Sequence, residues 1–169
     1  MKISIIGYKN HASRLENILK SIGIIPYMWN HHIDNFTDLI GSDAILISSP
    51  NDTHVQYIKD ILDISPHSYI FCEKPPAVNL EELDYLDRLD SDTKGKIFFN
   101  FNRRFSYMSK LVKERDLGKP VHFNFVSSHG LAFKDTFKDN WRFTSTNELM
   151  GVYGTVAVHY IDMCIWLLG

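Results

Sequence analysis

Hydrophobic and polar positions in the first part of the chain divide into short apolar runs and longer stretches with a helical period. Runs rich in β-branched and aromatic residues predict strands at residues 2–6, 24–29, 43–49, 68–72 and 96–100. Apolar residues spaced by three or four positions predict helical segments at residues 12–22, 36–40, 51–62 and 80–89. Strands that alternate with helices favour an α/β fold with a parallel, right-handed, doubly wound sheet.

The pattern changes near residue 118. Residues 121–127 alternate with period two, which predicts a strand with one exposed face, and residues 133–147 resemble a polar loop with several aromatic side chains. Residues 156–168 predict a strongly apolar helix. We expect a first domain at 1–118 and the start of an incomplete α+β domain at 119–169. A helix this apolar should not be exposed to water. We expect it to pack against the first domain or another chain, unless the chain is a truncated piece.

Composition and charge limit which partners, bound metals and cellular locations we expect. The 169 residues carry a formal net charge of -2 and no dense Lys/Arg run, so neither nucleic acid nor a membrane surface is an expected partner. No apolar run approaches the roughly 18 residues of a membrane span, and no secretory leader is recognisable. The two cysteines, Cys72 and Cys164, form neither a disulfide framework nor a four-cysteine zinc site. We expect a soluble protein of the reducing cytoplasm without a bound metal.

Ligands of open α/β sheets bind beyond the carboxyl ends of the strands, so polar residues there are candidates for function. A dinucleotide site has G-x-G-x-x-G after the first strand, where backbone and pyrophosphate approach closely. Residues 7–12 read G-Y-K-N-H-A, which keeps the first glycine and has a tolerable alanine at the third position. Lys9 replaces the middle glycine, and its side chain either blocks the pyrophosphate or swings aside and neutralises it.

The end of the second strand leaves the choice between NAD and NADP open. An acidic residue there would bind the ribose 2'-hydroxyl, but residues 29–32 read W-N-H-H. His31 and His32 are adjacent, so we expect their side chains to diverge, and no carboxylate or cysteine cluster supports a metal site. The sequence favours a solvated pair of loop histidines.

Two further strand ends carry more specific motifs. Residues 50–54 read P-N-D-T-H, and residues 73–75 read E-K-P. P-N-x-x-H and E-K-P at successive strand ends resemble the Gfo/Idh/MocA oxidoreductases, relatives of glucose-fructose oxidoreductase and inositol dehydrogenase. The similarity extends over essentially the whole chain, through segments that resemble the family's N-R-R-F, I-G-x-P, W-R and H-x-x-D…W-L-L-G motifs at residues 102–105, 117–120, 141–142 and 159–169.

This resemblance implies a Rossmann-type domain and hydride transfer between NAD or NADP and a sugar-like or nucleotide-sugar alcohol or ketone, in a homo-oligomer. Lys74 would polarise the reacting oxygen and His159 would take the hydroxyl proton. The implied cofactor contacts are Gly7, Tyr8, Lys9, Asn10, Ser49, Pro50, Asn51, His54, Glu73 and Lys74. The implied substrate contacts are Arg103, Arg104, Trp141, Arg142 and Thr155.

Each candidate also has a purely structural explanation. Lys74 could be a solvated lysine at a strand end, and His159 a core histidine with satisfied hydrogen bonds. Asn51 could cap a helix. Arg103 and Arg104 could form surface ion pairs, and the sequence does not choose between them for substrate binding.

The chain departs from the family in two respects. Thr155 stands where the family has an aspartate four residues before the histidine, on the same helix face, and a threonine cannot act as a carboxylate base. The chain is also about half the family's length. Together with Lys9, these departures favour an alternative hypothesis, a nucleotide-binding pseudo-enzyme or subunit without turnover. A purely structural α/β module would leave the polar strand ends unexplained.

Overall fold

The computed structural model describes residues 1–115, 118, 122, 124–126, 147, 149, 151 and 153–168. The chain forms two compact units, Met1–Asn100 and Phe101–Gly169, and each is described by itself. The domain boundary after residue 118 stays a prediction.

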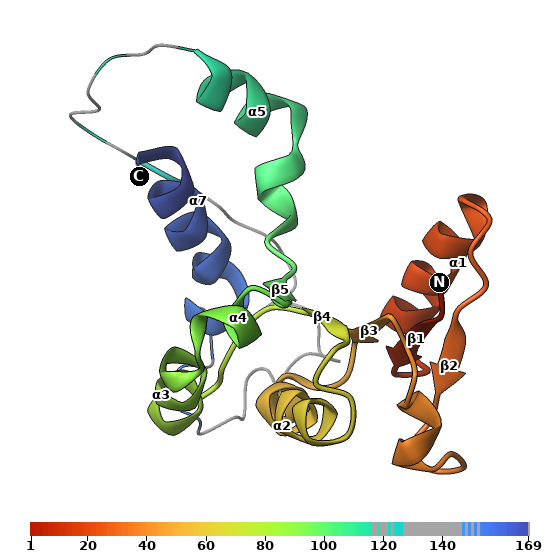
Figure 1. Ribbon diagram of the computed structural model, residues 1–169. Coiled ribbons are helices and arrows are strands. Elements are labelled where there is room, and N and C mark those ends of the chain that lie inside the picture. Colours follow the sequence, from red (N-terminus) through yellow and green to blue (C-terminus); the bar gives the residue numbers. More distant parts are fainter. Residues whose placement is uncertain are drawn as a thin grey trace, which may run out of the picture. The chain divides into compact units, whose positions relative to one another are not determined.

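The first unit is built on a five-stranded parallel sheet with the strand order β2-β1-β3-β4-β5 (Figure 1). This order confirms the predicted doubly wound α/β fold. The chain winds outward from β1 to one edge and then from β3 to the other, as two right-handed crossover series require. The strands are β1 (Ile3–Ile6), β2 (Tyr27–Trp29), β3 (Ala44–Ile47), β4 (Tyr69–Cys72) and β5 (Ile97–Phe99).

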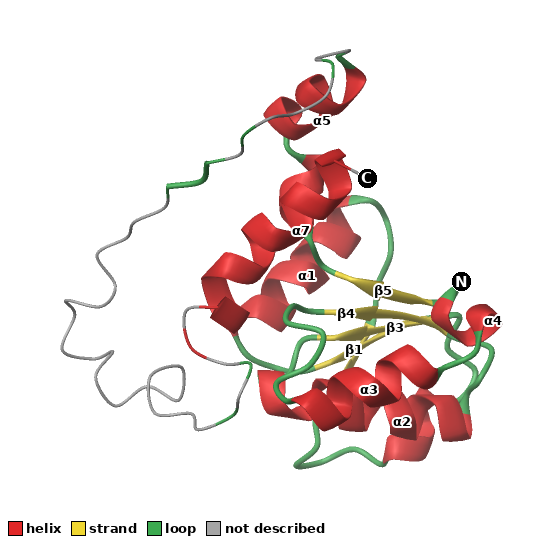
Figure 2. Ribbon diagram, turned by 90° about the vertical axis from the view of Figure 1, so that its left-hand side faces the viewer, coloured by secondary structure: helices red, strands yellow, loops and turns green. Residues whose placement is uncertain are grey.

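Helices cover both faces of this sheet, α1 on one face and α2 and α3 on the other (Figure 2). The predicted helical segments are confirmed, with ends displaced by a few residues. The short helix α4 was not predicted, because its four residues carry no helical period. The helices are α1 (Asn10–Ser21), α2 (His54–Ile64), α3 (Leu80–Arg88) and α4 (Ser91–Lys94), with 3-10 turns at Phe36–Leu39 and Asn51–Thr53.

The core explains why the central strands read as continuous apolar runs. All four residues of β1 are buried, as are Ile45 and Ile47 of β3, because helices pack on both sides of these strands. Ser4 is the polar exception within β1, and its hydroxyl lies 2.8 Å from that of Ser42 in a buried hydrogen bond. The rigid centre of the sheet therefore fixes the points at which each strand ends.

The second unit contains a 3-10 turn at Asn102–Phe105, α5 (Tyr107–Glu114), a π-helical segment at Tyr153–Ala157 and α7 (Val158–Leu168). The apolar helix predicted for residues 156–168 is thus confirmed, with π geometry in its first two residues. The strand predicted at 121–127 and the loop predicted at 133–147 lie mostly outside the described residues. None of the helices described here has both the length and the apolar character that crossing a membrane requires.

Candidate functional site

The parallel register brings four strand ends to one edge of the sheet. Ile6 of β1 pairs with Ile47 of β3, which pairs with Cys72 of β4, which in turn pairs with Phe99 of β5. The next residue of each strand therefore lies beside its neighbours, and polar chemistry gathers along the edge. These residues are Gly7, Ser48, Glu73 and Asn100.

The turn after β1 needs glycine at its first position. Gly7 has φ +132°, and a Cβ built there would lie 2.7 Å from the carbonyl oxygen of Ser48. A side chain would be excluded both by this backbone conformation and by the close approach of β3. Ala12 is buried at the third position of the motif, where a larger residue has no room.

Two features of this turn fit a dinucleotide. Helix α1 starts at Asn10 with Lys9 in extended conformation as its N-cap, and the N–H groups of such a first turn are oriented to receive an anion. The Ser48 hydroxyl beside the turn is buried and has no hydrogen-bond partner among the described residues. A buried hydroxyl of this kind is uncommon in a folded protein, and it is compatible with a hydrogen bond to a ligand bound at the turn.

Glu73 of the E-K-P motif joins three elements. Its Oε1 lies 2.6 Å from Nε2 of His11 in the first turn of α1, and it accepts a hydrogen bond from the Asn100 side chain at 2.7 Å. Glu73 is mostly buried, whereas the His11 side chain is about half exposed. The carboxylate is therefore held between the turn at residues 7–12 and the end of β5, and it fixes the backbone from which Lys74 extends.

His11 and Asn100 were not predicted from the sequence as site residues. Each is a polar residue next to a strand-end motif, but 62 residues separate His11 from Glu73, and 27 residues separate Asn100 from it. The only available signal was the register, which places residue 100 beside residue 73 once the order of β4 and β5 is known.

His54 ties the P-N-x-x-H motif to the E-K-P motif. Its side chain is completely buried, with Nδ1 3.0 Å from the carbonyl oxygen of Pro75 and Nε2 3.2 Å from that of Ser49. Burial lowers the pKa of His54, so the ring is neutral at pH 7 and has one N–H to donate. The nearer carbonyl, that of Pro75, is the better acceptor. His54 thus links its own P-N-x-x-H segment to the E-K-P segment through the Pro75 carbonyl, and its direct contact with a cofactor stays a prediction.

The remaining residues of the two motifs line the same edge. Ser49 and Asn51 are half-buried and Pro50 is exposed, and the Thr53 hydroxyl donates to Ser49 Oγ at 2.7 Å. Lys74 is half-buried, and its peptide bond to Pro75 is cis. The predicted cofactor contacts around these two motifs are therefore brought together by the fold.

The histidine pair after β2 contradicts the prediction that the two side chains diverge. The ring centroids of His31 and His32 lie 3.8 Å apart, so the two side chains do not diverge. The chain turns tightly here, with the N–H groups of Ile33 and Asp34 both donating to the Asn30 carbonyl oxygen, and this turn places both rings on the same side. Within the part of the chain that the structure describes, no group of three or more His, Cys, Asp or Glu residues could hold a metal.

In the second unit, Arg104 forms a bidentate ion pair with Asp162. Arg104 Nε donates to Asp162 Oδ2 at 2.8 Å, and its Nη2 donates to the other carboxylate oxygen. Asp162 is buried, and the hydrogen bonds to it raise the pKa of Arg104. Arg103 instead places its guanidinium 4.7 Å from the Tyr160 ring centroid. Within the described part of the chain, Arg104 forms an ion pair and Arg103 does not.

Thr155 and His159 occupy successive turns of the C-terminal helical segment. The Thr155 hydroxyl donates to the carbonyl oxygen of Gly151 at 2.6 Å, and the half-buried His159 ring meets Phe101 edge-on at 6.4 Å between centroids. Trp141 and Arg142 lie outside the described residues. Because Lys74 and His159 belong to different units, their action as a pair stays a prediction.

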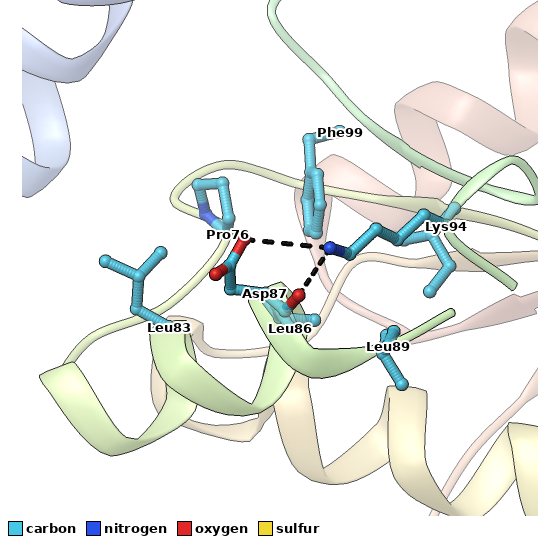
Figure 3. Close-up of a pocket in the computed structure, with 8 residues that line it drawn as sticks. Pro76, Leu83, Leu86, Asp87, Leu89, Lys94 and Phe99 are labelled. Atoms are coloured by element: carbon cyan, nitrogen blue, oxygen red, sulfur yellow. Dashed lines mark hydrogen bonds and ion pairs between the residues drawn. The ribbon is translucent and has the colours of Figure 1, made fainter. Parts of the chain in front are cut away.

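A separate cavity of about 330 Å³ lies against β5 and α3 (Figure 3). Its walls are apolar apart from Lys94 and Asp87, which form an ion pair at 3.6 Å. Among the residues that the structure describes, none of the predicted cofactor or substrate contacts lines it. The apolar walls are formed by Pro76, Leu83, Leu86, Leu89, Ile97 and Phe99.

Two family models match the chain. Residues 4–101 match the oxidoreductase family with an NAD-binding Rossmann fold, and residues 105–169 match the GFO/IDH/MocA C-terminal domain.

Individual relatives agree with these models. The chain is 26% identical over 169 residues to glucose-6-phosphate 3-dehydrogenase of Bacillus subtilis (strain 168), covering 95% of this chain and 45% of that protein. It is 29% identical over 128 residues to inositol 2-dehydrogenase of Rhizobium meliloti (strain 1021), covering 75% of this chain and 37% of that protein. The chain thus spans less than half the length of these curated relatives.

A solved structure shares the fold. The crystal structure of an NAD binding oxidoreductase from Klebsiella pneumoniae superposes with a TM-score of 0.78 at 19% identity, over 100% of this chain and 53% of that one.

The close approach at Gly7 predicts a large effect of adding one methyl group. Gly7→Ala should lower the free energy of unfolding by about 3 kcal/mol, because it adds a steric overlap with Ser48 to the strain of a positive φ. Gly41→Ala is the matched control, since Gly41 has φ +75° with nothing near its Cβ, and it should cost about 1 kcal/mol. Urea unfolding of both variants measures the difference, and equal losses would contradict the close approach.

The buried, neutral His54 predicts a dependence of stability on pH. Its pKa is lowered in the folded protein, while the unfolded chain retains about 6.5, so the unfolded state binds the extra proton. The stability that neutral His54 contributes is complete above about pH 6.5 and is lost as the pH falls, by up to about 1.4 kcal/mol per pH unit.

A glutamine at this position keeps an N–H donor but does not titrate. We therefore predict that His54→Gln reduces the loss of stability between about pH 7.5 and about pH 5, as measured by urea unfolding. His67→Gln, which changes an exposed histidine before β4, should leave the slope unchanged. A slope in His54→Gln as steep as in the original protein would refute the assignment of this pH dependence to His54.

Proposed function

Because the chain belongs to the Gfo/Idh/MocA family of NAD-binding oxidoreductases, we propose that it transfers a hydride between a nicotinamide dinucleotide and a sugar-like alcohol or ketone. The observation that carries this proposal is the convergence of the Gly7 turn, the Ser48 hydroxyl and the Glu73–Lys74 pair at one sheet edge. The names of the curated relatives, which refer to a glucose phosphate and to inositol, support a polyhydroxylated substrate.

The cofactor would lie along the carboxyl edge of the sheet. The turn at residues 7–10 and the first turn of α1 would bind the pyrophosphate, because the backbone N–H groups of a first helical turn donate hydrogen bonds to an anion and Gly7 brings no side chain to the turn. Residues 49–51 and the Ser48 hydroxyl would bind the part of the dinucleotide that comes next after the pyrophosphate. When bound, the nicotinamide supplies or accepts the hydride.

Lys74 is the residue we assign to the reacting oxygen. An ammonium group there stabilises the negative charge that the oxygen carries in the transition state, both when a carbonyl accepts hydride and when a deprotonated alcohol gives it up. His11 and Asn100 hold the neighbouring Glu73 carboxylate, so that the segment bearing Lys74 has a fixed position. His159 would take the hydroxyl proton in the complete active site, with Arg103, Trp141, Arg142 and Thr155 on the substrate side.

The alternative, a pseudo-enzyme that binds the nucleotide without turnover, depends mainly on Thr155. Its hydroxyl donates to Gly151 within its own helical segment, so it does not replace the carboxylate of the family. Family membership and the complete E-K-P segment favour the enzyme. A homo-oligomeric state and a cytoplasmic location stay predictions.

The Lys74 assignment predicts a loss of turnover that is separable from cofactor binding. Lys74→Met should lower kcat by about 100-fold or more, because it removes a cation at the developing charge. The Kd of the reduced dinucleotide, measured by isothermal calorimetry, should change by less than about threefold. The assay is dinucleotide-linked oxidation of a panel of cyclitols and sugar phosphates.

Lys59→Met on α2 is the matched control, since Lys59 lies over the Tyr85 ring and away from the motifs. It should retain both binding and turnover. A Lys74→Met protein as active as the original would contradict the assignment, and a chain that binds neither dinucleotide would refute the proposed function as a whole.

A further inference from the structure

The end of β2 is the place where a dinucleotide fold distinguishes NAD from NADP. The Gly7 N–H donates to the Trp29 carbonyl oxygen at 3.2 Å, so the turn at residues 7–12 lies next to the end of β2. An acidic residue after this strand binds the ribose 2'-hydroxyl of NAD, whereas basic groups nearby accommodate the 2'-phosphate of NADP. In this chain the residue after Trp29 is Asn30, and an acceptor carboxylate is replaced by a neutral amide.

Four exposed side chains gather at this point, and we name Tyr8, Lys9, His31 and His32 the 2'-end cluster. Tyr8 Oη lies 3.1 Å from Nε2 of His32, and the Tyr8 ring centroid is 5.7 Å from each histidine ring. The Lys9 ammonium lies 5.9 Å from the Tyr8 ring centroid. The cluster therefore combines a permanent cation, two imidazoles and a phenol within reach of one another.

The Asp34 carboxylate of the loop after β2 binds the loop backbone. Its Oδ2 accepts the Asn30 backbone N–H at 2.7 Å. The Asn30 side-chain oxygen accepts the His32 backbone N–H at 3.1 Å. These acceptors stabilise the loop itself, which leaves the ammonium and the ring N–H groups of the cluster as the donors on the exposed side.

Such a set of groups matches a phosphate better than a hydroxyl. A phosphate offers several acceptor oxygens and negative charge, and charge-assisted hydrogen bonds to lysine and histidine are about twice as strong as neutral ones. A 2'-hydroxyl, by contrast, would meet a cation, and the Asp34 carboxylate of this loop already accepts the Asn30 backbone N–H. This arrangement also explains why a lysine replaces the middle glycine of the motif, because a glycine at position 9 would supply no charge.

We infer that the 2'-end cluster binds the 2'-phosphate of NADP, so that the protein selects NADP over NAD. This inference rests on the proposed function and specifies its cofactor. Lys9 supplies the fixed charge, His31 and His32 supply ring N–H donors, and Tyr8 holds the His32 ring in place.

The test is a set of four calorimetric titrations of the whole chain, with NADPH, NADH, adenosine 2',5'-bisphosphate and ADP. NADPH should bind at least about tenfold more tightly than NADH, which corresponds to about 1.4 kcal/mol and to one charge-assisted hydrogen bond. The bisphosphate should be preferred to ADP, which shows that the 2'-phosphate and not the nicotinamide carries the difference.

The double variant His31→Asn/His32→Asn should weaken NADPH binding about tenfold and change NADH binding by less than about threefold, and Lys9→Gln should weaken NADPH binding more than NADH binding. Asn30→Asp should shift the preference toward NADH, because it adds the missing acceptor. Lys20→Gln, at the other end of α1, and His67→Asn are matched controls and should change neither Kd. Circular dichroism of each variant confirms that it is folded.

Two outcomes overturn the inference and leave the proposed function intact. One is equal or tighter binding of NADH by the original chain, and the other is a loss of NADH and NADPH binding by the same factor in the cluster variants. Failure of the folded original chain to bind either dinucleotide would refute both the inference and the proposed function.

Discussion

The parallel register of the central strands is the constraint on which the rest of the structure depends. β1, β3, β4 and β5 pair so that the residues after Ile6, Ile47, Cys72 and Phe99 stand side by side. Helices on both faces bury these strands, and a slip in register would expose their apolar side chains. The same packing that stabilises the core therefore sets the position of every polar group at the carboxyl edge.

Around this edge, separate contacts fix separate parts of the site. Gly7 allows the turn at residues 7–12 to approach Ser48 closely. His54 holds the backbone of the P-N-x-x-H and E-K-P segments together. Glu73 joins α1 to the ends of β4 and β5 through His11 and Asn100. Lys74 is thus attached to a segment that is held from both sides, and such a fixed position suits the role that we propose for it at a substrate oxygen.

Much of the fold could be predicted from the sequence because most of its strands and helices have a local period. The apolar runs predicted the strands, which the structure confirms. The register also places the polar residues that follow these strands side by side, and their role in chemistry stays a prediction. The contacts of Glu73 could not be predicted, because they join residues distant in sequence. The expected divergence of His31 and His32 was wrong, since the turn at Asn30 and the Tyr8 ring override the tendency of adjacent side chains to separate. The structural role of His54 could not be read from its motif, because a histidine at a helix start gives no sign of being buried.

The central claim is that the register-aligned carboxyl edge, and no other surface of the first unit, binds the dinucleotide. Hydrogen–deuterium exchange of the chain with and without the tighter-binding reduced dinucleotide tests this most directly, because it reports each backbone segment separately. The account predicts protection confined to residues 7–12, 30–32, 48–54 and 73–75, with no change at the amino edge around residues 24–26 and 66–69. Protection at the amino edge or around the cavity beside α3, with residues 7–12 and 73–75 unchanged, would contradict it.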